Sequence, residues 1–74
     1  METYIDIFLN ADGEKASIIE KKLIEMGLKP TIGDHDFVYD WGKIVDTSEV
    51  VSLVDKIQSN LEGSGVILKF KTNR

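Results

Sequence analysis

Tyr4-Ile5-Asp6-Ile7-Phe8-Leu9 has the apolar spacing of a β-strand and decides how the rest of the chain is interpreted. Side chains alternate along a strand, so one face carries Ile5, Ile7 and Leu9 and the other carries Tyr4, Asp6 and Phe8. A second run of this kind covers residues 66–71, near the other end of the chain. Two helix-like segments and a hairpin-like stretch lie between the two runs. The order of elements is therefore β-α-β-β-α-β in one small unit.

Length and composition set limits on the protein class. We expect residues 1–74 to form a single domain with a thin core, since a chain this short buries only about 60% of its unfolded surface. It has no Cys and one histidine, His35, which excludes disulfides, thiolate zinc sites and paired-histidine metal sites. A hydrophobic fraction of 42% with 30% charged residues is typical of a soluble globular domain.

The sequence argues against membrane insertion, secretion and nucleic-acid binding. No apolar run approaches the ~20 residues of a membrane span, and the chain opens with a strand instead of a leader, so we expect a cytoplasmic protein. The net charge is −4, and the basic residues are scattered, which argues against a nucleic-acid partner.

The first helix is predicted over residues 12–26. Its apolar stripe recurs at spacings of three and four, at Ala16, Ile19, Leu23 and Met26. Asn10 or Asp12 would cap its N-terminus, and Gly27 lies where a left-handed C-cap is needed.

A β-hairpin is predicted between the two helices. Residues 28–32 read as a weak strand that belongs at a sheet edge, because Pro30 cannot donate a ladder hydrogen bond. Gly33-Asp34 suits a two-residue turn, followed by an alternating strand over residues 36–41. The alternative places the turn at Trp41-Gly42, with a very short return strand over residues 43–45.

The second helix is predicted to start at Asp46-Thr47-Ser48-Glu49, where three residues are good caps and Glu49 suits the positive first turn. Its stripe, which Gly63 and Gly65 terminate, consists of Val50, Val54, Ile57 and Leu61, widened by Val51 and Leu53. The last strand follows over residues 66–71, and we expect Thr72–Arg74 to fray.

These elements predict an α+β fold, the ferredoxin-like βαββαβ sandwich. It has a four-stranded antiparallel sheet with both helices on one face, strands one and three central, and strands two and four at the edges. The strand-three aromatic residues should point inward, because burying the alternating Asp36 and Asp40 would cost several kcal/mol. The face toward the helices then carries Ile5, Ile7, Leu9, Phe37, Tyr39, Trp41, Val66, Leu68 and Phe70.

The other, uncovered face is predicted to carry Tyr4, Asp6, Phe8, Asp36, Val38, Asp40, Ile67, Lys69 and Lys71. Matching the core rows of strands one and four places Asp6 opposite Lys69 and Tyr4 opposite Lys71, and Lys69 would neutralise Asp6.

An apolar patch on an uncovered sheet face indicates a contact surface. The first functional hypothesis is therefore a non-enzymatic interaction or structural module that pairs with itself, as a homodimer, or with another protein. Its interaction face would be Tyr4, Asp6, Phe8, Val38, Ile67, Lys69 and Lys71.

The second hypothesis is a small-ligand or ion sensor. Asn10-Ala11-Asp12-Gly13, between a strand and a helix, resembles the ligand loop of ACT domains, which are βαββαβ regulatory modules that often bind amino acids at a subunit interface. The usual Pro before the Gly is replaced by Asp12. The resemblance implies ligand binding at Asn10, Asp12 and Gly13.

Acidic residues suggest two weaker cation sites. Asp34-His35-Asp36 does not converge in a strand, because His35 then points away from both carboxylates. Asp6, Asp36 and Asp40 could meet across neighbouring strands, since hard cations accept carboxylate ligands, but we assign no metal residue and no cofactor.

RNA binding ranks third, and catalysis is not expected. Aromatic residues on strands one and three resemble the RNA-recognition motif, but that family's glycine- and basic-led consensus is absent from residues 36–41, and Asp36 and Asp40 would repel phosphate. The five serines lie in or beside helices, far in sequence from His35, so no nucleophile and base are paired and no catalytic residue is assigned.

Overall fold

The computed structural model describes residues 1–73, which form four strands and two helices. The elements in chain order are β1 (Glu2–Phe8), α1 (Ala16–Glu25), β2 (Lys29–Pro30), β3 (Phe37–Asp40), α2 (Thr47–Asn60) and β4 (Ile67–Asn73). The predicted α+β class, with two helices and a four-stranded antiparallel sheet, is confirmed.

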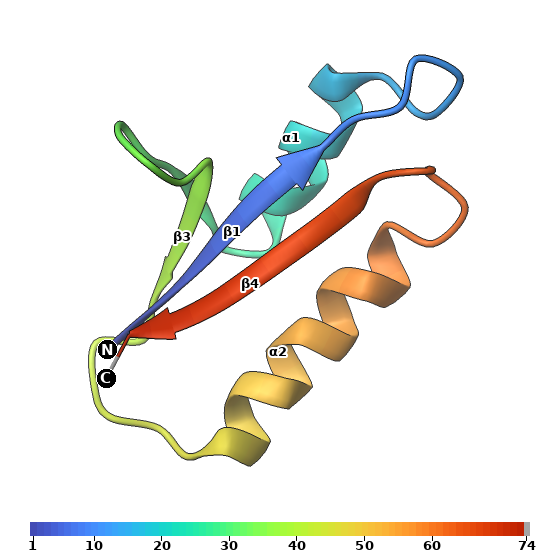
Figure 1. The fold of residues 1–74 in the computed structure, drawn as a ribbon. Helices are drawn as coiled ribbons and strands as arrows, with labels where there is room; N and C mark the ends of the chain where they lie inside the picture. The colour runs from blue at the N-terminus through green and yellow to red at the C-terminus, as the bar shows by residue number, and fades with distance from the viewer. Residues whose placement is uncertain (74) are drawn as a thin grey trace.

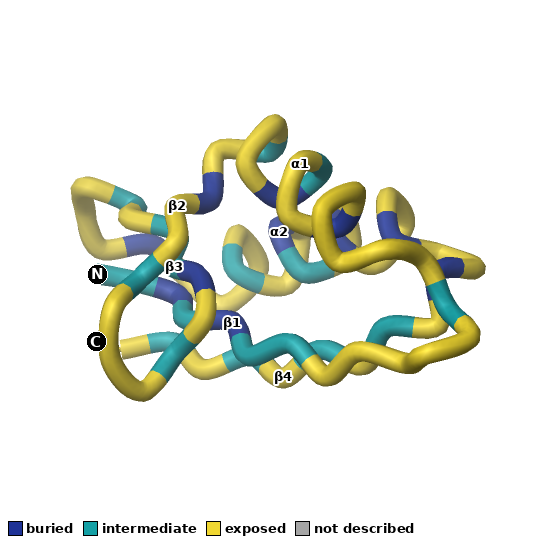
Figure 2. The backbone as a smooth tube through the Cα atoms, turned by 90° about the horizontal axis from the view of Figure 1, so that it is seen from above, coloured by how far each residue is buried: buried dark blue, intermediate teal, exposed yellow. Residues whose placement is uncertain are grey.

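The strands lie in the order β2-β3-β1-β4, so β1 and β3 are central and β2 and β4 are edges. Both helices lie on the same side of this sheet (Figure 2). β1 begins and β4 ends at one end of the sheet, where Glu2 is opposite Asn73 (Figure 1). Thr72 and Asn73 are therefore paired strand residues, contrary to the predicted fraying, while Arg74 lies outside the described residues.

The core lies between the sheet and the helices. Its buried cluster draws on both helices and both central strands and consists of Ile5, Ile19, Leu23, Leu28, Phe37, Leu53, Ile57 and Leu61. Half-buried residues that pack against it are Ile7, Met26, Tyr39, Trp41, Val66, Leu68 and Phe70. The predicted inward orientation of the strand-three aromatic residues is thus confirmed. Leu9 and Val51 were wrongly assigned to the core: they are 55% and 50% exposed.

Polar contacts on the inner face tie three strands together. The Trp41 indole Nε1 donates to the hydroxyl of Thr3 at 2.9 Å, and this hydroxyl lies 3.0 Å from the hydroxyl of Thr72. Thr3 is fully buried, so these contacts satisfy a group that would otherwise lose its hydration. The indole N–H of Trp41 therefore finds its partner on β1.

The two helices begin differently. Asp46, one of three candidate caps from the sequence, caps α2: its carboxylate accepts from the Glu49 amide at 2.9 Å. α1 begins four residues later than predicted and has no side-chain cap: its cap position is Lys15, and Asn10 instead accepts from the Asp12 amide at 3.0 Å.

The end of α1 follows the prediction. Gly27 has φ 93°, and the amides of Gly27 and Leu28 donate to the carbonyls of Ile24 and Leu23. This is the Schellman pattern of a glycine-terminated helix.

The hairpin joins β2 to β3 around Gly33, and the alternative turn at Trp41-Gly42 is wrong. The connection spans residues 31–36, however, and is not a two-residue turn. β2 has only two residues and pairs through Lys29 with Val38 and through Pro30 with Phe37, at the sheet edge.

Candidate functional site

The sheet face opposite the helices, called here the open face, gathers the residues of the predicted interaction surface. Thr3 and Ile5 are fully buried toward the helices, so the alternate residues of β1 point the other way. Pairing then extends this face across the sheet: Tyr4 is opposite Val38 and Lys71, Asp6 is opposite Lys69, and Phe8 is opposite Ile67. The strand-four register predicted from the sequence is confirmed.

An apolar pair lies at one end of the open face. Phe8 is 56% exposed and Ile67 is 67% exposed, and they are directly opposite each other on β1 and β4. Side chains at such positions have Cβ atoms about 5 Å apart, so the two form one continuous apolar surface. No helix covers this side of the sheet (Figure 2).

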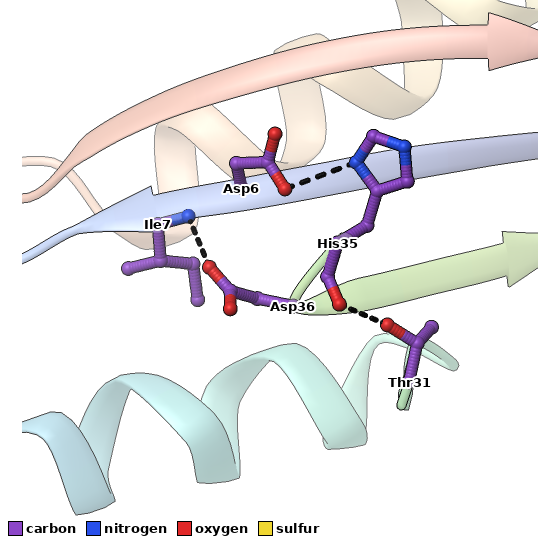
Figure 3. A network of polar contacts seen from close by, with 5 residues as sticks. All are labelled: Asp6, Ile7, Thr31, His35 and Asp36. Atoms are coloured by element: carbon purple, nitrogen blue, oxygen red, sulfur yellow. Dashed lines mark hydrogen bonds and ion pairs between the residues drawn. The ribbon is translucent and has the colours of Figure 1, made fainter. Parts of the chain in front are cut away.

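His35 occupies the middle of the open face, although it comes from the β2–β3 loop. Its Nδ1 lies 3.1 Å from a carboxylate oxygen of Asp6 (Figure 3). Its ring also stacks on Tyr4, with 4.6 Å between the ring centroids. The side chains of His35 and Asp6 are 28% and 27% exposed. The sequence did not predict this contact between His35 and Asp6, which lies on the neighbouring strand β1.

Asp36 does not lie on the open face, which corrects a prediction: it lines a hollow on the helix side of the sheet, beside Ile7 and Phe37. Its carboxylate accepts from the Ile7 amide at 2.8 Å, where β3 no longer supplies a backbone partner (Figure 3). Thr31 holds the same loop by donating its hydroxyl to the His35 carbonyl. The side chain of Asp36 thus replaces one bond of the β1–β3 ladder.

The carboxylate cluster that the sequence suggests as a weak cation site does not form. Asp6 contacts His35, Asp36 contacts Ile7, and Asp40 accepts from the Gly42 amide. Within residues 1–73, no group of three histidine or acidic side chains could hold a metal ion.

The charged residues of the open face have other partners than predicted. Lys69 lies opposite Asp6 in the register, but the Asp6 carboxylate contacts the His35 imidazole instead. Lys69 and Lys71 are both exposed and make no ion pair with another residue of the described chain. Two cationic side chains are thus available on β4.

The loop expected to bind a ligand packs against the loop that precedes β4. The Glu14 amide donates to the Ser64 carbonyl at 2.8 Å, and the Gly13 amide donates to the Asn10 carbonyl at 2.9 Å. A Cβ atom at Gly13 would lie only 2.5 Å from the Ser64 carbonyl, so this position needs glycine for close approach. This loop therefore closes one end of the sandwich, and the amides of Asp12, Gly13 and Glu14 are engaged within the chain.

Two hollows lie on the helix side of the sheet. One, of about 420 Å³, lies between the inner-face aromatic residues Tyr39 and Trp41 and the start of α2. The other, of about 300 Å³, lies beside the start of α1 and is lined by Ile7, Leu9, Phe37 and neighbours. His35 lines neither, so the imidazole and its carboxylate partner are not combined with a described cavity.

Two aspartates that would face each other across β1 and β3 are the sequence signal for the His35 contact. Ile5 pairs with Phe37, so a regular continuation of the strand would place Asp36 directly opposite Asp6. Opposed like charges destabilise a strand pair. The loop avoids this conflict by turning Asp36 to the Ile7 amide and bringing His35 to Asp6.

In the part of the chain that the structure describes, no helix has the length and apolar character that crossing a bilayer requires. No protein-family model, curated protein or solved structure matches this chain. The open face, with its exposed Phe8–Ile67 pair and its two exposed lysines, is the candidate functional site of the described residues.

Proposed function

We propose that this protein is a small, non-enzymatic interaction module of ferredoxin-like architecture that self-associates through its open face. The strand order β2-β3-β1-β4 and the placement of both helices on one side support this architecture (Figures 1 and 2). The single observation that carries the function is the exposed Phe8–Ile67 pair on a sheet face that no helix covers.

A second copy of the chain is the occupant that this pair fits. A two-fold interface presents the same patch from both subunits, so a compact apolar row can stack on itself. The pair lies at one end of the face, one row away from the Asp6–Lys69 row. Two copies can therefore bring their apolar rows together without burying an acidic residue.

The size of the face limits the strength of this association. A seven-residue strand is about 23 Å long and four strands are about 19 Å wide, which gives a plan area of about 440 Å². Stable interfaces take ~800 Å² from each partner, so we expect a weak dimer that forms only at high concentration.

Sedimentation equilibrium over a wide concentration series tests the proposal. We expect the average mass to rise with concentration for the natural chain and to stay at the monomer value for Phe8→Lys. Burying a Phe is worth roughly 1.5–3 kcal/mol, so its loss should weaken the dimer more than tenfold.

Ile44→Lys is the matched control. Ile44 is 85% exposed but lies in the loop between β3 and α2, so this variant should self-associate like the natural chain. A natural chain that stays monomeric throughout the series contradicts the proposal. Equal weakening by Phe8→Lys and Ile44→Lys also contradicts it, because general charge and not the open face would then be responsible.

A further inference from the structure

The two edges of the sheet are unequal, and the β4 edge is open to another strand. β2 has two residues and contains Pro30, whereas β4 has seven residues, Ile67–Asn73, and no proline. β4 pairs with β1 on one side and ends the strand order on the other. An unpaired strand edge of this length is a template for strand addition.

The side chains along β4 alternate in a way that selects the chemistry of an added strand. On the open face, Lys69 and Lys71 are exposed. Asp6 lies opposite Lys69, but its carboxylate contacts His35 and not Lys69. On the inner face, Leu68 and Phe70 are only half-buried. A neighbouring strand would therefore meet two cations on one face and two apolar side chains on the other.

A second β4 is a poor occupant of this edge. A two-fold axis that relates antiparallel edge strands is perpendicular to the sheet, so it places residues of the same face opposite each other. Registers centred on Lys69 or Lys71 put that lysine opposite its own copy, and a register centred on Phe70 puts Lys69 opposite Lys71. Opposed like charges disfavour all three central registers.

We propose that the β4 edge binds an extended segment of another protein in which acidic and apolar residues alternate. The segment adds a fifth strand: its acidic side chains lie beside Lys69 and Lys71, and its apolar side chains extend the row of Leu68 and Phe70. Backbone hydrogen bonds supply affinity, and the alternation supplies specificity. This inference does not rest on self-association, because it uses the edge of the sheet and not the Phe8–Ile67 pair.

The probe is a seven-residue peptide that alternates glutamate and valine, titrated into the uniformly labelled protein and followed by amide chemical shifts. We expect the shifts to concentrate in residues 67–73 and β4 amides to exchange more slowly with solvent. A peptide with lysine in place of glutamate should bind at least tenfold more weakly. A peptide N-methylated at alternate residues should also lose binding, because it keeps the charges but cannot form the ladder.

Protein variants complete the test. Lys69→Glu with Lys71→Glu should weaken binding of the glutamate peptide at least tenfold. Lys21→Glu with Lys56→Glu changes the net charge equally at exposed helical positions and should bind as the natural chain does. Phe8→Lys should also retain binding, which separates this inference from self-association.

Three results would overturn the inference. One is an absence of shifts in residues 67–73 at millimolar peptide. Another is equal binding by the N-methylated peptide, which would reduce the contact to electrostatics. The third is equal binding by the two double variants, which would leave Lys69 and Lys71 as charges that only protect the edge from aggregation.

Discussion

The two halves of the sheet are built on different principles. β1 and β4 pair in one unbroken register over seven residues, from Glu2 with Asn73 to Phe8 with Ile67. On the other side, β1 pairs with β3 over four residues, and β2 contributes two. There, side chains of the β2–β3 loop form hydrogen bonds to β1 beyond the end of the backbone pairing. Asp36 accepts from the Ile7 amide, and His35 contacts Asp6. Continuous backbone pairing stabilises the β1–β4 half, and individual polar side-chain contacts supplement the shorter pairing on the β3 side.

Ile5→Ala should have the largest effect, because Ile5 belongs to both halves. It is fully buried and pairs with Phe37 on β3 and Phe70 on β4. Truncating a buried Ile costs about 2–5 kcal/mol, which approaches the whole stability of a small domain. Urea unfolding should show a single transition at a much lower midpoint, because both halves lose the same support.

Ile67→Ala is the control for that experiment, since Ile67 lies on the same sheet but is 67% exposed. Its unfolding midpoint should change little. If Ile5→Ala produced two separated transitions, the halves would be independent units and the comparison would fail.

Asp36→Ala should have an intermediate effect confined to the β3 side. It removes the acceptor of the Ile7 amide, which is exposed enough for water to replace part of the bond. We expect a loss of about 0.5–1.5 kcal/mol in the free energy of unfolding. Hydrogen exchange should be faster at Ile7 and unchanged along β4.

Asp36→Asn keeps an acceptor oxygen and should retain most of the protection at Ile7. Equal exchange rates in the Ala and Asn variants would show that the hydrogen bond is not what holds this end of β3.

His35→Ala should have the smallest effect on stability. The Asp6 contact is more than a quarter exposed, and partly exposed ion pairs contribute at most ~1 kcal/mol. Loss of the imidazole also removes the ring stacked on Tyr4. Relaxation measurements should show more motion over residues 31–36, with the β1–β4 pairing unchanged. Increased motion on β4 instead would contradict the division into halves.

The orientation of residues in the extended strands was predictable from the sequence, and the contacts of the β2–β3 loop were not. The pairing of Asp6 with Lys69 and of Tyr4 with Lys71 follows from alternation plus the need to bury one face. The inward orientation of Phe37, Tyr39 and Trp41 follows from the cost of burying acidic residues. These rules apply only where the backbone is extended.

Alternation predicted which strand residues share the open face, but it predicted neither the presence of His35 there nor its contacts. Alternation placed Asp36 on the open face, yet it lies in a loop, where the period of two does not apply. The same limit hid the contact of His35 with Asp6. The start of α1 was missed because Asn10 bonds to its own turn, and short polar side chains cap turns as readily as helices.

The closeness of Glu2 and Asn73 at one end of neighbouring strands has a mechanical consequence (Figure 1). A force that pulls these two residues apart acts across the β1–β4 ladder and not along it. The hydrogen bonds of the ladder then break one after another, in an unzipping geometry, instead of bearing the force together. The most regular half of this sheet should therefore be the first to yield under tension applied at these residues.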